Sequence, residues 1–212
     1  MRARGGCPAG VPCFIVTSLP DAQAAARLYC DLFGWTAEEQ MPADAPATTS
    51  RRSSTAANVA GISSQPSGAP ANAVWSTYIA VDDADDAADG SAPPAAACCP
   101  RRSTSSTRDG WPSAPIRKAR FSLWQAGRHT GAHVVNAQGS CNWSDLHTRG
   151  VGAAPHWAVT FAVDGTDATA DRAAALGAPI LAAPCEAGPT RIATLRDPQG
   201  ATFSISTYTP RG

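Results

Sequence analysis

The chain has 212 residues, 43% of them apolar and only 16% charged, which is enough for one large globular domain or two small ones. Its 17 basic and 17 acidic side chains cancel, so the composition excludes recognition of nucleic acid or an anionic membrane through net charge. No apolar run approaches the roughly 20 residues of a membrane span, and the basic N-terminus leads into a stretch broken by glycine and proline, so we expect a cytoplasmic protein.

The first elements predicted along the chain are a strand and an amphipathic helix. Residues 14–17 form a short apolar run that indicates a strand. Asp21 stands at the N-cap of a helix that ends at Gly34, and apolar side chains recur along one face of it. That face consists of Ala25, Leu28, Tyr29, Leu32 and Phe33.

The next predicted strand is residues 75–81, because β-branched and aromatic side chains dominate it. Asp82 or Asp83 then caps an alanine-rich helix. A later strand contains Trp143, Asp145 and His147, which alternate and therefore share one side of it.

The C-terminal part predicts a helix and a hairpin. Asp164 or Thr166 caps the helix, and Gly177 stops it. Residues 191–195 and 201–207 predict two strands joined by the turn sequence Asp-Pro-Gln-Gly, in which proline fixes φ and glycine tolerates positive φ.

An internal repeat is the strongest signal in the sequence. The run that begins at Trp75 matches the run that begins at Trp157, and Ala119-Arg-Phe-Ser-Leu matches Ala201-Thr-Phe-Ser-Ile, both at an offset of 82 residues. The start of the first copy aligns with the chain from Trp143 at an offset of 129. The difference predicts that the second copy lacks about 47 residues, between 154 and 156, that would form a helix and its following strands.

The repeated stretches resemble the vicinal oxygen chelate superfamily, also called the glyoxalase/bleomycin resistance/dioxygenase superfamily, in its two-module actinobacterial form. The resemblance is carried by four motifs, which are residues 21–35, 59–62, 78–83 and 197–203. It implies an α+β fold of tandem modules built from β-α-β-β-β units whose sheets curl around a cavity, with the second module incomplete.

On this basis we expect a first module at 10–126, a linker at 127–139 and a truncated second module at 140–210. Two runs depart from the pattern, 43–57 and 90–118, and the second shows no helix or strand period. A one-base shift of reading frame would restore an Asp-Pro-Gln-Gly turn near its end, so translation out of frame is one explanation. A naturally diverged loop is the other.

Enzymes of the superfamily hold a divalent metal on inward-facing strand positions, and the metal polarises substrate oxygens as a Lewis acid. By resemblance, three of these four positions fall on poor metal ligands in both copies, and the fourth is not aligned from the sequence. The pairs are Phe14 and Trp143, Ser76 and Ala158, and Ser122 and Ser204. We therefore expect no metal or other cofactor.

Other candidate residues carry weaker signals. His129 and His133 are four residues apart, but Gly131 lies between them in the predicted linker, so we expect them to face solvent. Trp75 and Trp157 are out of phase with the ligand positions, so we expect them to pack under helices. The polar residues that could line a ligand cavity are Ser76, Tyr78, Asp145, His147, Thr160 and Ser204.

Seven cysteines, an odd number with no C-x-x-C pair, indicate free thiols rather than a disulfide framework or a zinc site. Three functions stay open: metal-free binding of a small apolar or aromatic molecule, metal-dependent lyase, isomerase or dioxygenase chemistry, and a non-functional remnant. Whether the protein is an enzyme is not decided by the sequence. An incomplete second module would expose sheet edge, so pairing into a homo-oligomer is also expected.

Overall fold

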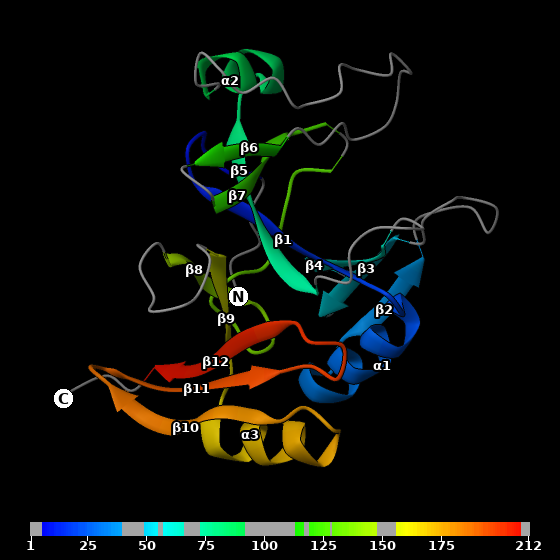
Figure 1. The fold of residues 1–212 in the computed structure, drawn as a ribbon, viewed down its shortest axis with the longest axis vertical. Helices are drawn as coiled ribbons and strands as arrows, with labels where there is room; N and C mark the ends of the chain where they lie inside the picture. The colour runs from blue at the N-terminus through cyan, green and yellow to red at the C-terminus, as the bar shows by residue number, and fades with distance from the viewer. Residues whose placement is uncertain are drawn as a thin grey trace.

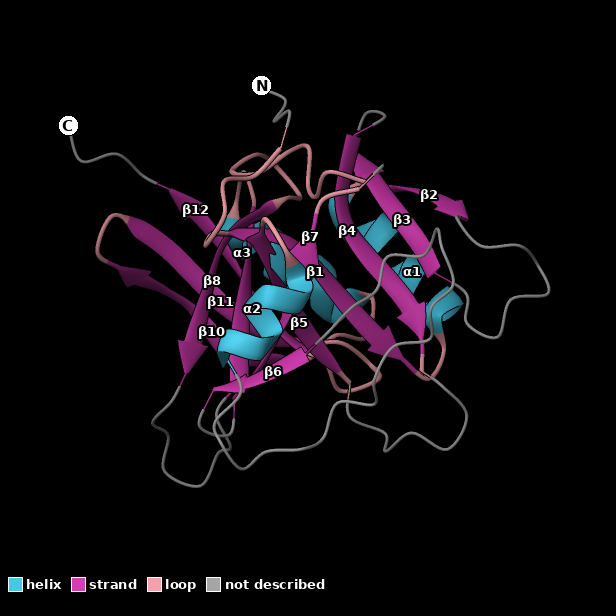
Figure 2. Cartoon of the chain, turned by 90° about the horizontal axis from the view of Figure 1, so that it is seen from above, coloured by secondary structure: helices cyan, strands magenta, loops and turns pink. Residues whose placement is uncertain are grey.

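A computed structural model describes residues 6–39, 49–54, 57–65, 73–91, 113–116, 119–127, 129–147 and 156–208. These residues form two separate sheets, the first with two helices and the second with one (Figure 2). Figure 1 shows the two sheets stacked along the long axis of the molecule. The α+β class and the two-module organisation expected from the sequence are confirmed. Within the described ranges no helix is long and apolar enough to cross a membrane.

The first sheet has the strand order β2-β3-β4-β1-β5-β7-β6. Helix α1 follows β1, and helix α2 follows β5, which reproduces the order of two linked units of a strand, a helix and further strands. The elements are β1 (Pro12–Leu19), α1 (Ala22–Phe33), β2 (Thr36–Glu39), β3 (Thr49–Ser54), β4 (Ala57–Ser64), β5 (Val74–Val81), α2 (Ala84–Ser91), β6 (Ser113–Ile116) and β7 (Ala119–Gln125).

The second sheet has the order β10-β11-β12-β9-β8, and helix α3 lies against β10 and β11 (Figure 1). Its elements are β8 (Cys141–His147), β9 (His156–Ala162), α3 (Thr166–Ala175), β10 (Ile180–Ala187), β11 (Thr190–Arg196) and β12 (Thr202–Tyr208). In the part of the chain that the structure describes, no strand pairs with the outer edge of β8. The equivalent edge of β1 in the first sheet pairs with β4.

The strand registers reproduce both repeat offsets. Tyr78 pairs with Ser122 between parallel strands, and Thr160 pairs with Ser204 in the same way, 82 residues further on. Phe14 lies opposite Tyr78, and Trp143, which is 129 residues after Phe14, lies opposite Thr160. Each of these antiparallel pairs also carries one bulge at the equivalent place. The two sheets therefore carry the same unit, and β8 takes the place of β1.

The predicted helix caps are confirmed in the first module and wrong for α3. Asp21 accepts a hydrogen bond from the backbone of Ala24, and Asp83 accepts two from the first turn of α2. Helix α3 is instead preceded by Gly165, which provides no side-chain cap. Thr166 donates its hydroxyl to the carbonyl of Arg191 on β11, so tertiary packing diverts the side chain expected to cap.

Strands also lie inside the two runs that the sequence singled out as irregular. Strand β3 falls in 43–57 and pairs with β2 and β4, and β6 falls in 90–118 and pairs with β7. The expectation that 90–118 has no strand is wrong at its C-terminal end, because backbone pairing along β7 orders four residues that have no strand pattern of their own. Residues 92–112 lie outside the described residues, as do 40–48 and 55–56.

One aromatic core joins the two modules. Tyr29 and Phe33 on α1 contact Trp75 of the first sheet and Phe161 and Phe203 of the second. All five side chains are buried. Helix α1 therefore covers aromatic surface of both sheets, and Trp75 packs under a helix as expected.

Polar contacts close the same interface. Gln199, in the Asp-Pro-Gln-Gly turn of the second module, accepts a hydrogen bond from the backbone of Asp21 and donates one to its carbonyl, over 2.7 and 2.8 Å. Tyr29 donates its hydroxyl to the buried carboxylate of Asp197 over 3.0 Å and accepts from the indole of Trp75 over 3.1 Å. The turn predicted from the sequence thus also fixes the two modules to each other.

Candidate functional site

The face of the first sheet that carries Phe14, Tyr78 and Trp124, its inner face, is filled by the protein's own side chains. The rings of Phe14 and Trp124 lie 5.5 Å apart, and His129 packs against both at 4.9 Å. His129 is only 4% exposed. The expectation that His129 faces solvent is therefore wrong, because the segment that contains it folds onto the sheet instead of leaving it.

Backbone contacts hold this segment, residues 129–135, in place. The amide of Ala132 donates to the carbonyl of Cys13 and that of His133 to Asn58, each over 2.8 Å. A Cβ on Gly131 would stand 2.8 Å from the Cys13 carbonyl oxygen, and the backbone there has φ of +96°. Only glycine meets both conditions without strain, so Gly131 permits the close approach.

On the first sheet, the positions that hold the metal in enzymes of the superfamily carry no side chain that suits a cation. Phe14, Ser76 and Ser122 stand on the inner face. Gly61 pairs with Val16 between the parallel strands β1 and β4, so it corresponds by register to Ser122, which pairs with Tyr78 between β5 and β7. A Cβ at Gly61 would touch the Phe14 ring at 3.3 Å, which places it on the same face. A phenyl ring, a glycine and two hydroxyls do not match the imidazole and carboxylate donors that divalent metals prefer.

Tyr78 fills part of the space between these positions. Burial raises the pKa of its phenol to about 12, despite a hydrogen bond with Ser122 that lowers it. The hydroxyl is therefore a neutral hydrogen-bonding group at physiological pH, not a general base.

The equivalent positions of the second sheet are Trp143, Ala158 and Ser204, and they are no better suited to a cation. Ser204 shares a hydrogen bond of 3.1 Å with Thr194, and Thr160 beside it is buried. This face of the second sheet, its inner face, is equivalent by register to that of the first.

Trp143, Asp145 and His147 share one exposed side of β8, as the sequence predicted. Their strand forms the outer edge of the second sheet within the described ranges. Trp157, on the next strand, is half-buried, and its buried indole N–H has no hydrogen-bond partner in the described structure.

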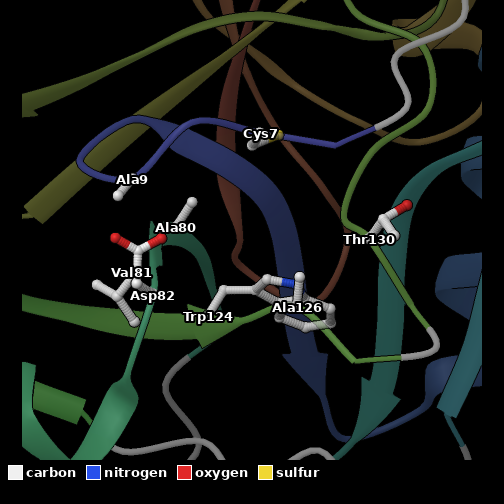
Figure 3. A pocket seen from close by; sticks show the side chains of 8 residues that line it. All are labelled: Cys7, Ala9, Ala80, Val81, Asp82, Trp124, Ala126 and Thr130. Atoms are coloured by element: carbon white, nitrogen blue, oxygen red, sulfur yellow. The ribbon is translucent and has the colours of Figure 1, made fainter.

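Two pockets open at the same place in the two modules. The first has a volume of about 200 Å³, and Figure 3 shows its lining side chains around Trp124 and Asp82. The second has a volume of about 580 Å³. The first is lined by Cys7, Ala9, Ala80, Val81, Asp82, Trp124, Ala126 and Thr130, and the second by Asn136, Ala137, Gln138, Asn142, Trp143, Ala162, Val163, Asp164, Ser206, Thr207 and Tyr208.

Seven lining positions of the first pocket have repeat equivalents in the second. Five correspond at an offset of 82 and two at 129. The pairs are Ala80 and Ala162, Val81 and Val163, Asp82 and Asp164, Trp124 and Ser206, Ala126 and Tyr208, Cys7 and Asn136, and Ala9 and Gln138. The pockets are therefore two copies of one site that have diverged.

The residue types at these positions explain the difference in volume. Trp124 stands in the first pocket where the small Ser206 stands in the second, and Thr130 of the covering segment closes the first further. In the second module Asn142 donates a hydrogen bond of 2.8 Å to Ser206, so the wall there is short and polar. The second pocket consequently stays open, and its volume is within the roughly 300 to 1,000 Å³ typical of ligand sites.

The second pocket combines two aromatic rings with neutral polar groups and one acid. Trp143 and Tyr208 are 38% and 66% exposed, which is unusual for side chains of this size. Of the lining residues that the structure describes, Asp164 alone is charged. Such a lining can stack on a flat ligand and hydrogen-bond at its edges.

The six ligand residues expected from the sequence lie on the inner faces of the two sheets. Ser76 and Tyr78 are on the inner face of the first sheet, and Thr160 and Ser204 are on that of the second. Asp145 and His147 are on the inner face of the second sheet as well, at its exposed edge strand. None of the six lines either pocket. The lining residues Asp164, Ser206 and Tyr208 were missed, although the repeat offset pairs each with a residue of the first module.

Comparison with curated proteins finds relatives along nearly the whole chain, although no family model matches it. A Mycobacterium bovis protein named as a glyoxylase, CFP32, is 31% identical over 252 residues, covering 95% of this chain and 96% of the relative. The anthracycline biosynthesis protein DnrV of Streptomyces peucetius is 29% identical over 264 residues, covering 92% of each.

Comparison with solved structures gives the same fold. The Mn(II)-bound glyoxalase of Novosphingobium aromaticivorans matches with a TM-score of 0.60 and 14% identity, over 94% of this chain and 83% of that one. The 2,3-dioxygenase LapB of Pseudomonas sp. KL28 matches with a TM-score of 0.58 and 10% identity, over 97% and 96%.

Proposed function

Because the chain belongs to the glyoxalase/bleomycin resistance/dioxygenase superfamily, we propose that it uses this fold to bind a small aromatic molecule without a metal ion. The observation that carries the proposal is the second pocket, an open site with two exposed aromatic rings. The inner-face positions that would hold a metal support it, since they carry aromatic, hydroxyl or small side chains.

The absence of suitable donors argues against a metal at these positions. In the ranges that the structure describes, no three His, Cys, Asp or Glu side chains come together in a way that could hold an ion. The structural relatives include a Mn(II)-bound glyoxalase and a dioxygenase, so metal use occurs within this fold. We propose that this chain has kept the fold and lost the ligands.

The aromatic character of the ligand has two supports. Trp143 and Tyr208 offer ring faces to whatever enters the pocket. The relative DnrV is named for anthracycline biosynthesis, and anthracyclines are planar polycyclic aromatic compounds. Both favour a flat ligand over a flexible aliphatic one.

The proposed organisation is a first module at 10–126 and a truncated second module at 140–210, joined by 127–139. The alignment with CFP32 spans 252 positions but contains only 95% of the 212 residues of this chain, so about 50 positions of CFP32 have no counterpart here. In the described ranges, β8 occupies the place of β1, but no strand equivalent to β4 lies beside it. Both observations support the loss of about 47 residues. The five described cysteines are all free thiols, which supports a cytoplasmic location.

We further propose that the outer edge of β8 pairs with a second copy of the chain. An edge strand presents unpaired amides and carbonyls, and an isologous dimer would satisfy them on both copies. Light scattering at micromolar concentration tests this proposal. A dimer supports it, and a monomer contradicts it.

Two measurements on the purified protein test the proposed function. Elemental analysis should find no stoichiometric Mn, Fe, Ni or Zn, and fluorescence titration should show saturable binding of 9-aminoacridine or acridine. A stoichiometric metal bound to the purified protein would overturn metal-free binding and favour metal-dependent lyase or dioxygenase chemistry. Absence of binding by both probes, with a cooperative thermal transition retained, would overturn aromatic binding.

A further inference from the structure

We infer that the second pocket, and not its equivalent in the first module, binds one positively charged planar aromatic molecule per chain. This inference rests on the proposed function and adds the charge of the ligand, its place and its stoichiometry. It comes from the divergence of the two repeated pockets, which have the same origin and now differ in size, aromatic content and polarity.

The acid of the second pocket determines the charge of the ligand. Among the described residues that line the pocket, Asp164 is the one charged side chain. The backbone amide of Asp164 donates a hydrogen bond of 2.6 Å to the side-chain oxygen of Gln138, which also lines the pocket. This contact holds the backbone of Asp164 at the pocket wall. A bound cation gains attraction from the carboxylate, whereas a bound anion is repelled by it.

The two rings supply a second reason for a cation. Trp143 projects from β8 and Tyr208 from the end of β12, and both line the same pocket. The face of an aromatic ring carries negative charge density, so a planar cation is attracted to it more strongly than a neutral molecule of the same shape. Trp is the strongest of the aromatic side chains in this respect.

The first pocket keeps the acid but lacks both exposed rings. Asp82 stands where Asp164 does, but Ala126 replaces the ring of Tyr208. Trp124 fills the space left open by Ser206, and it packs against Phe14 and His129 rather than facing solvent. At about 200 Å³ the first pocket is below the range typical of ligand sites.

The repeat provides a matched pair of variants for the test. Asp164→Asn removes the carboxylate from the second pocket, and Asp82→Asn removes its equivalent from the first. The probes are 9-aminoacridine, which is a cation at neutral pH, and acridine, which is neutral there and has the same ring system. Binding is measured by fluorescence titration at low salt, with stoichiometry from isothermal calorimetry.

We expect the wild-type protein to bind one 9-aminoacridine per chain, about threefold to tenfold more tightly than acridine. Asp164→Asn should bring the two affinities together, and Asp82→Asn should leave their ratio unchanged. Tyr208→Ala should weaken both probes, because it removes a stacking surface. Ser206→Trp, which installs the residue of the first pocket, should abolish binding, while Ser206→Ala should not.

The outcomes separate this inference from the proposed function. Equal affinity for the two probes, or a loss of selectivity in Asp82→Asn rather than in Asp164→Asn, overturns the inference and leaves metal-free aromatic binding standing. Two bound molecules per chain also overturn it. If neither probe binds the wild type, both the inference and the proposed function fail.

Discussion

Removal of the Tyr29 hydroxyl tests whether the two modules form one cooperative structure. The phenol joins helix α1 of the first module to the turn of the second, because it donates to Asp197 over 3.0 Å and accepts from Trp75 over 3.1 Å. Tyr29→Phe keeps the ring and its contacts with Phe33 and Phe203. The variant therefore removes two hydrogen bonds and almost no apolar contact.

The magnitude follows from what the substitution leaves behind. Asp197 is 2% exposed and keeps the backbone hydrogen bonds from Gln199 and Ala201, both over 2.9 Å, but its second oxygen loses the donor that the structure gives it. Hydrogen bonds to charged groups contribute about 1.5 to 3 kcal/mol. Since the Trp75 indole also loses its acceptor, we expect a loss of about 2 to 4 kcal/mol.

Calorimetry measures this loss as a change in Tm. For a chain of this length each kcal/mol lowers Tm by about 2 to 4 °C, so Tyr29→Phe should lower it by roughly 5 to 15 °C. The wild type should unfold in one transition if the modules are coupled. Tyr208→Phe is the matched control, because that ring is 66% exposed and its hydroxyl should matter little to stability. A Tm decrease no larger than in the control would refute the reasoning.

Three further predictions concern the first module. Gly131→Ala should destabilise the protein by roughly 1 to 3 kcal/mol, because the new Cβ would meet the Cys13 carbonyl oxygen at a residue with positive φ. The control Gly34→Ala also has positive φ but lies in open space, so it should destabilise by only about 1 kcal/mol, and equal losses in denaturant titrations would contradict the close approach at Gly131. At pH 8 the Cys13 thiol should react far more slowly than the exposed Cys185, because burial raises the pKa of Cys13 to about 12, which peptide mass spectrometry after alkylation checks. Burial also raises the pKa of Tyr78 to about 12, so the folded state keeps a proton that the unfolded chain releases near pH 10. The buried Cys13 thiol acts in the same direction from about pH 9, so the unfolding free energy should fall as the pH rises from 9 to 11, and a free energy that rises over this range in denaturant titrations would contradict the burial of both groups.

The local elements could be predicted because each has a short-range cause. Helix α1 begins at Asp21 and ends at Gly34 as predicted, since capping and the left-handed C-terminal residue depend on a few neighbours in sequence. The Asp-Pro-Gln-Gly turn was also correct. The cap of α3 was wrong because Thr166 bonds to a strand that is distant in sequence.

The position of His129 shows the limit of this kind of prediction. Glycine-rich sequence around it indicates a linker, and the segment has no regular structure as expected. Its burial depends on Phe14 and Trp124, which are far away in the chain and form the surface it covers. No local pattern encodes that contact.

The sequence alone determined the duplication and its two offsets, because a repeated unit must place equivalent residues in equivalent registers, and the pairing of Tyr78 with Ser122 and of Thr160 with Ser204 follows that rule. It did not determine which of the two copies holds an open pocket. That was decided by tertiary packing: Trp124 fills one copy with a side chain anchored by Phe14 and His129, while Ser206 leaves the other copy open. A pocket is the space that distant side chains fail to fill, so it appears only when the chain is folded.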